Sequence, residues 1–67
     1  METPYERGYQ SGRVIDPSCC SLEEHEQIYQ EEIDGLPDIK KKDPVQAAEH
    51  AEYMKGWIAG VHKVFQE

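Results

Sequence analysis

Near the end of this 67-residue chain stands the sequence Tyr53-Met54-Lys55-Gly56-Trp57-Ile58-Ala59-Gly60. Its pattern occurs a second time near the start, as Tyr5-Glu6-Arg7-Gly8-Tyr9-Gln10-Ser11-Gly12. Both copies read Tyr, any residue, a cation, Gly, an aromatic residue, any residue, a small residue and Gly. A glycine inside a helix costs about 1 kcal/mol relative to alanine, so four glycines in two helices require a structural reason.

In each copy the two glycines are four positions apart, so they lie on one face of a helix and allow another backbone to approach closely. The neighbouring aromatic side chain can then cover the joint and bury a large area. We therefore predict that a short N-terminal helix crosses a long C-terminal helix at their Gly-x-x-x-Gly faces. The residues of this structural motif are Gly8, Tyr9, Gly12, Gly56, Trp57 and Gly60. The alternative is a chance similarity in which Gly12 only ends the first helix.

Capping signals predict three helices in an all-α fold. A capping residue is followed three positions later by Glu or Gln at three places, as in a capping box. The pairs are Thr3 with Glu6, Ser21 with Glu24, and Asp43 with Gln46. Gly35 and Pro37 are typical of a helix end. We expect helices at about 4–12, 22–34 and 44–65 in a single domain spanning 1–67, with Lys40 to Lys42 in a solvated connector.

Apolar residues recur with the helical period in the second and third of these segments. In the second, the predicted inner face consists of Leu22, His25, Ile28, Tyr29 and Ile33. In the third, the main stripe is Ala47, Ala51, Met54, Ile58, Val61 and Phe65, and an adjacent stripe is Tyr53, Trp57, Gly60 and Val64. This wide apolar arc favours a homodimer. The alternative is a monomer in which residues 13–20 cover the remainder.

The charge is strongly segregated. The chain has 14 acidic and 7 basic side chains, a net charge of -7, and no basic residue between Arg13 and Lys40. The acidic residues that we single out in this interval are Glu23, Glu24, Glu26, Glu31, Glu32 and Asp34. Direct nucleic-acid binding through this segment is disfavoured, because phosphate affinity comes from Lys and Arg. The acidic helix is either a solvated surface or a surface that docks on a basic partner.

The glycine and aromatic motifs resemble those of ribosome modulation factor and its small relatives. The resemblance is carried by Glu6-Arg7-Gly8-Tyr9-Gln10-Ser11-Gly12 and Gly56-Trp57-Ile58-Ala59-Gly60. It implies a short bacterial helical protein that associates with the small ribosomal subunit and promotes inactive ribosome dimers. This chain departs from that family in being acidic rather than basic and in having a longer, acidic segment between the motifs.

Signals for catalysis, metals and cofactors are weak. Cys19 and Cys20 are adjacent, a spacing that strains a disulfide and rarely chelates one metal, so we expect reduced thiols, with an intermolecular disulfide or metal site as the alternative. His50 and His62 are twelve positions apart and too distant to share an ion. We expect no enzyme activity, no metal and no cofactor. No run is long enough for a membrane span and no signal peptide is recognisable, which predicts a cytoplasmic protein.

Two binding functions follow from these patterns. In the first, the acidic helix docks on and inhibits or modulates a basic protein that handles nucleic acid, as phage and mobile-element inhibitors and mimics of DNA charge do. In the second, the protein is a ribosome-associated factor like its basic relatives. The RNA contacts would then be Arg7, Arg13, Lys40, Lys41, Lys42 and Lys55.

Overall fold

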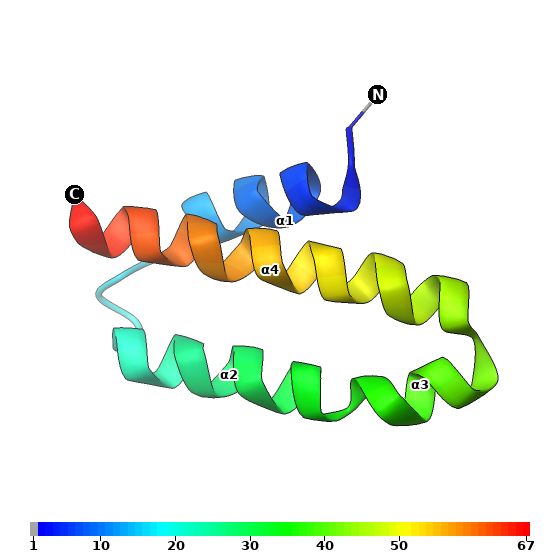
Figure 1. Ribbon diagram of the computed structural model, residues 1–67. Coiled ribbons are helices and arrows are strands. Elements are labelled where there is room, and N and C mark those ends of the chain that lie inside the picture. The colour runs from blue at the N-terminus through cyan, green and yellow to red at the C-terminus, as the bar shows by residue number, and fades with distance from the viewer. Residues whose placement is uncertain (1) are drawn as a thin grey trace.

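The computed structural model describes residues 2–67, and the predicted all-α class is confirmed: these residues form helices and no strand. The helices are α1 (Pro4–Arg13), α2 (Leu22–Asp34), α3 (Leu36–Lys42) and α4 (Pro44–Gln66). The long helix α4 lies between α1 on one side and the α2–α3 pair on the other (Figure 1). Within residues 2–67, α1 does not pack against α2 or α3, so α4 is the helix that packs against both sides.

The three predicted N-terminal caps are formed. The Thr3 hydroxyl accepts a hydrogen bond from the Glu6 amide at 3.1 Å, and the Asp43 carboxylate accepts one from the Gln46 amide at 3.1 Å. Ser21 and Glu24 form a reciprocal capping box at the start of α2. Each cap satisfies a backbone donor that has no partner inside the helix, which is why these local patterns fix the helix starts.

Two helix ends differ from the sequence-based expectation. Gly12 lies inside α1, which continues to Arg13, because its face is held against α4 instead of turning away. Gly35 does not take the left-handed conformation of a terminating glycine: its φ is -81° and its ψ is -11°. The chain therefore turns only slightly and starts again as a helix, with Pro37 in the first turn, where a proline is tolerated.

The lysines at 40–42 are consequently helical rather than part of an irregular connector. They form the last turn of α3, where cations interact favourably with the helix dipole. The connection to α4 is only Asp43, which both follows α3 and caps α4. Because the connection is so short, α3 folds back directly against the start of α4.

Helices α1 and α4 run parallel to each other, and the glycines of each helix lie against the backbone of the other. A Cβ added to Gly8 would lie 2.9 Å from the Trp57 nitrogen, and one added to Gly56 would lie 2.9 Å from the Tyr9 nitrogen. One helical turn further, a Cβ on Gly12 would lie 2.9 Å from the Val61 nitrogen. Real Cβ atoms do not approach backbone so closely, so the two helices pack at a distance that only glycine permits.

The molecule is a single layer of helices with a thin core. Its extents are 37 × 28 × 14 Å, and the shortest is close to the width of one helix. The radius of gyration is 12.3 Å, against about 11 Å for a compact domain of this length. The buried side chains of the core are Ala47, Met54, Val61 and His25. Most other apolar residues are only half-buried, because a single layer cannot enclose them.

Candidate partner-binding surface

The acidic helix α2 is held in place by its inner face. His25 is 6% exposed, and its ring centroid lies 5.8 Å from that of Trp57 and 5.7 Å from that of Phe65, both on α4. The ring Nδ1 lies 2.8 Å from the Ser21 carbonyl oxygen, to which it donates a hydrogen bond. Leu22, Tyr29 and Ile33 are half-buried beside it. Ile28, predicted for the same face, is 45% exposed and lies at its edge.

The six predicted contact residues do not share one face. All six are exposed. With about 100° of rotation per residue, Glu23, Glu31 and Asp34 point away from α4 and form, with Gln27, an outer row about 16 Å long. Glu24 lies at the edge of that row. Glu26 and Glu32 lie on opposite flanks of α2, so a flat partner that meets the outer row does not reach both of them.

Some of these carboxylates already have partners inside the protein. Glu24 closes the capping box with Ser21, and Glu32 lies 3.3 Å from the His50 Nε2 on α4. Asp34 accepts a hydrogen bond from the Gln30 amide at 2.9 Å. In the described part of the chain, Glu23, Glu26 and Glu31 take part in no ion pair or side-chain hydrogen bond, so the outer row retains free acceptors.

The charges at the two ends of α2 have opposite effects on the helix: Glu23 and Glu24 in the first turn are favourable, whereas those in the last turn are unfavourable. Its last turn contains Glu31, Glu32 and Asp34 and no basic residue, although the negative end of the helix dipole lies there. Glu31 and Asp34 are also three positions apart, where like charges repel. The C-terminal part of the row, Glu31 and Asp34, is therefore placed against local electrostatics, whereas Glu23 is not.

The predicted cationic residues do not gather on one surface. Arg13 of α1 is paired with Glu67, and Lys55 of α4 is paired with Glu52 at 3.4 Å. Arg7 lies on α1, whereas the lysines at 40–42 lie on α3, which does not contact α1. The RNA contacts expected from the family resemblance are thus divided among three helices, and two of them are engaged by carboxylates.

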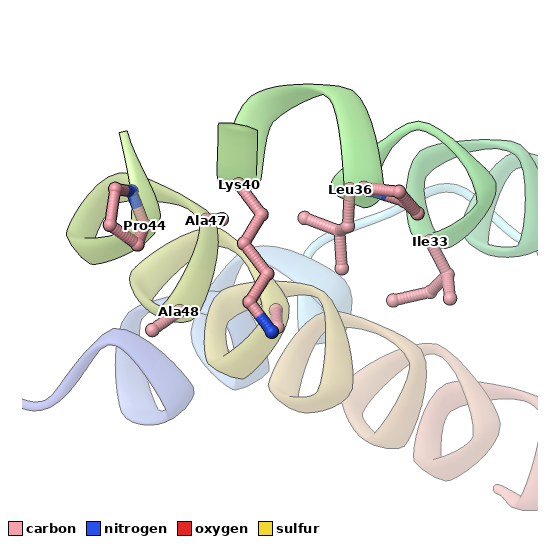
Figure 2. Close-up of a pocket in the computed structure, with 8 residues that line it drawn as sticks. Ile33, Leu36, Lys40, Pro44, Ala47 and Ala48 are labelled. Atoms are coloured by element: carbon pink, nitrogen blue, oxygen red, sulfur yellow. The ribbon is translucent and has the colours of Figure 1, made fainter. Parts of the chain in front are cut away.

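A groove that the sequence patterns did not predict lies between the α2–α3 pair and the first half of α4. Its volume is about 520 Å³. Its lining residues are Ile33, Leu36, Pro37, Lys40, Pro44, Ala47, Ala48 and Ala51. Figure 2 shows the side chain of Lys40 extending across it. The alanines leave the groove unfilled because their side chains are too short to reach α3. The cluster of alanines at 47–51 is the feature of the sequence from which the groove could have been predicted.

Metal-ligating residues are scattered in the structure. Within residues 2–67, no three His, Cys, Asp or Glu side chains come together in a way that could hold a metal ion. Cys19 and Cys20 are free thiols in the segment between α1 and α2. His50 is engaged with Glu32 and His25 is buried among aromatic rings, which gives each a structural contact.

Comparison with known protein families, with curated proteins and with solved structures gave no match for this chain. Over the described residues 2–67, no helix combines the length and the apolar character that crossing a bilayer requires. The candidate surface is therefore defined by its own geometry: an exposed acidic row on α2, held by an aromatic and histidine contact to α4.

Proposed function

We propose that this protein is a small non-catalytic binding protein whose α2 outer row docks on a basic surface of a nucleic-acid-handling protein and modulates or inhibits it. The observation that carries the proposal is the row of Glu23, Glu31 and Asp34, exposed on a helix that contains no cation. Arginines and lysines that normally hold phosphates would form charge-assisted hydrogen bonds with such carboxylates.

The spacing of the row supports this proposal. Glu23 and Glu31 are eight positions apart with the uncharged Gln27 between them, which places their carboxylates about 12 Å apart along the axis, and Asp34 follows about 4.5 Å further on. The backbone that carries the row is held by the capping box at one end and continues into α3 at the other. Carboxylates on one side of a capped helix offer a basic cleft negatively charged hydrogen-bond acceptors in place of phosphates.

The unfavourable position of Glu31 and Asp34 at the end of α2 also supports a binding role. Carboxylates at the C-terminal end of α2 oppose the helix dipole, and replacing them with lysine would stabilise the helix. A surface that only provided solubility could carry the same charges at favourable positions. The groove is a poorer site for a basic partner, because the ammonium group of Lys40 lies across it.

The decisive experiment is a pull-down with the tagged full chain from bacterial lysate, with and without nuclease, at low salt and at about 0.5 M salt, where the Debye length falls to a few ångströms. We expect one basic protein to be recovered despite nuclease and to be lost at high salt. A variant combining Glu23→Gln, Glu31→Gln and Asp34→Asn should lose it, since it removes the outer row without touching the capping box.

A matched control changes the same amount of charge elsewhere. The combination Glu6→Gln, Asp38→Asn and Glu49→Gln neutralises three exposed carboxylates on α1, α3 and α4. It should retain the partner. Equal loss of binding in the two triple variants would overturn the proposal, because it would show that only net charge matters.

The alternative function, ribosome association, rests on a different observation. The residues that carry the resemblance, Gly8 and Gly12 with Gly56 and Gly60, are those that form the contact between α1 and α4. Its expected result in the same pull-down is recovery of small-subunit ribosomal proteins that disappear after nuclease. Charge reversal of Glu23, Glu24, Glu31 and Glu32 to lysine would then leave or strengthen binding instead of abolishing it.

A further inference from the structure

Two neighbouring thiols meet in the link between α1 and α2. The Cys20 Sγ lies 3.8 Å from the Cys19 Sγ, to which it donates a weak hydrogen bond. Both are free thiols; Cys19 is exposed and Cys20 is half-buried. Neighbouring side chains of an extended chain point to opposite sides, so a contact between the two sulfurs requires a specific backbone arrangement.

The backbone on each side of the pair is hydrogen-bonded. The Cys19 amide donates to the Asp16 carbonyl oxygen at 3.1 Å, which closes a turn. The Asp16 carboxylate accepts hydrogen bonds from the Ser18 amide at 2.9 Å and from the Ser18 hydroxyl at 2.6 Å. Directly after the pair, Ser21 caps α2. The two thiols are therefore held between a turn and a helix start.

A direct disulfide does not suit this pair. The Cα atoms of adjacent residues are about 3.8 Å apart, whereas those of disulfide-linked residues are usually at least about 4.4 Å apart. A single additional atom between the sulfurs removes this conflict, because the sulfurs then stay near their present separation. Thiolates prefer soft, thiophilic elements as bridging atoms.

We propose that Cys19 and Cys20 form a vicinal dithiol site that captures a trivalent organoarsenical through both sulfurs. With an arsenic(III) oxide R–As=O, two S–As bonds form as the two S–H bonds and the arsenic–oxygen bond break. The two protons leave with the oxide oxygen as one water molecule. Arsenic remains in the +3 state, so the step requires no oxidant or reductant.

The surroundings favour an uncharged reactant of this kind. The hydrogen bond to Cys19 raises the pKa of the Cys20 thiol, and the nearby Glu24 and Asp16 carboxylates raise it further. The raised pKa favours the neutral form of the Cys20 thiol, and the neighbouring carboxylates repel anionic disulfides. A structural zinc site would need four ligands, and no third metal-binding side chain joins the pair in residues 2–67.

The test is titration of the full chain with phenylarsine oxide, followed by intact-mass measurement. We expect one equivalent to bind, with a mass gain of one reagent molecule less one water. The adduct should withstand excess 2-mercaptoethanol and be released by dithiothreitol, because only a dithiol competes with two linked sulfurs. The single variants Cys19→Ser and Cys20→Ser should bind at least about 100-fold more weakly in the presence of the monothiol, reflecting loss of the linked second sulfur.

A variant with two separated thiols provides the matched control. Cys20→Ser combined with Gln30→Cys keeps the number of thiols but moves one to the exposed surface of α2. It should lose the resistance to monothiol while its helical circular dichroism is unchanged. Equal resistance in this variant, or release of the arsenical from the native chain by 2-mercaptoethanol, would overturn the proposal.

Discussion

Gly8 of α1 and Gly56 of α4 occupy equivalent positions in a reciprocal contact. Gly8 lies against the backbone of α4 between Tyr53 and Trp57, and Gly56 lies against the backbone of α1 between Tyr5 and Tyr9. The internal repeat aligns Tyr5 with Tyr53 and Tyr9 with Trp57, so the contact has an approximate two-fold symmetry. A repeated motif meets its own copy because the two helices are parallel and in register.

The close approach of the two backbones predicts that adding one methyl group at these glycines strongly lowers the stability of the fold. Gly56→Ala should lower the free energy of unfolding by about 2 kcal/mol or more, because its Cβ would clash with backbone atoms of Tyr5 and Tyr9 that cannot rotate away. Gly56→Leu should prevent folding. Chemical denaturation monitored by circular dichroism measures both, with the surface change Gln27→Ala expected to leave stability unchanged.

Gly35 offers a sharper control for the same substitution. A Cβ at this position would meet the Glu31 and Glu32 carbonyl oxygens at 3.7 Å, an ordinary contact, and its φ of -81° suits alanine. Gly35→Ala should therefore raise stability by about 0.4–1 kcal/mol through the unfolded chain. If Gly35→Ala and Gly56→Ala had equal effects, the close approach of α1 and α4 would be contradicted.

The packing of His25 predicts that its ring shape matters more than its nitrogen atoms. His25→Ala should cost about 2–4 kcal/mol, since it removes a buried ring from between Trp57 and Phe65. His25→Phe should cost under about 1.5 kcal/mol, because the Ser21 carbonyl still accepts the backbone amide of residue 25. Thermal unfolding of the two variants separates ring packing from hydrogen bonding.

A single hydrogen bond links the two copies of the repeat. The Tyr53 hydroxyl donates to the Ser11 hydroxyl at 3.0 Å in a partly buried position. Tyr53→Phe should lower stability by about 1 kcal/mol. In a double-mutant cycle with Ser11→Ala, the two changes should be less than additive, and strict additivity would show that the bond contributes nothing.

The turn formed by Asp16 and Ser18 predicts that the free energy of unfolding depends on pH in the acidic range. Hydrogen bonds from the Ser18 hydroxyl and amide lower the pKa of Asp16 in the folded state. A lowered folded pKa stabilises the protein above the unfolded value, near 4, and this contribution is lost as pH falls through the folded pKa. The difference in free energy of unfolding between the native chain and Asp16→Asn should therefore shrink below about pH 4. When both chains also carry Ser18→Ala, this difference should depend less on pH, because the hydrogen bond from the Ser18 hydroxyl is lost.

Local patterns were sufficient to predict most of the helices. The caps at Thr3, Ser21 and Asp43 depend on hydrogen bonds within one turn, so the sequence specifies them directly. The end of α2 could not be predicted in the same way. Gly35 and Pro37 are typical of a stop, but the packing of Leu36 and neighbouring residues against α4 favours a second helical segment over a turn.

The acidic surface of α2 was likewise predictable from the sequence only in part. That α2 is acidic follows from its sequence, and helical geometry assigns Glu23, Glu31 and Asp34 to one row. Which carboxylates remain free was decided by contacts from α4 and from the cap: His50 engages Glu32, and Ser21 engages Glu24. The capping box made the contact of Glu24 predictable, whereas the contact of Glu32 joins residues 18 positions apart in the chain and was not revealed by the spacing of the acids.

The sequence by itself determined the helical class and the starts of α1, α2 and α4, because capping and periodicity are local properties; the repeated glycine motif predicted the contact of α1 with α4, which the tertiary structure places at those glycines. Only the tertiary structure decided that the helices form one layer about α4, that Lys40 crosses an apolar groove, and that the Cys19 and Cys20 sulfurs touch. These features depend on how three short helices share the surface of a long one, and that distribution is set by the sum of many small packing energies rather than by any single motif.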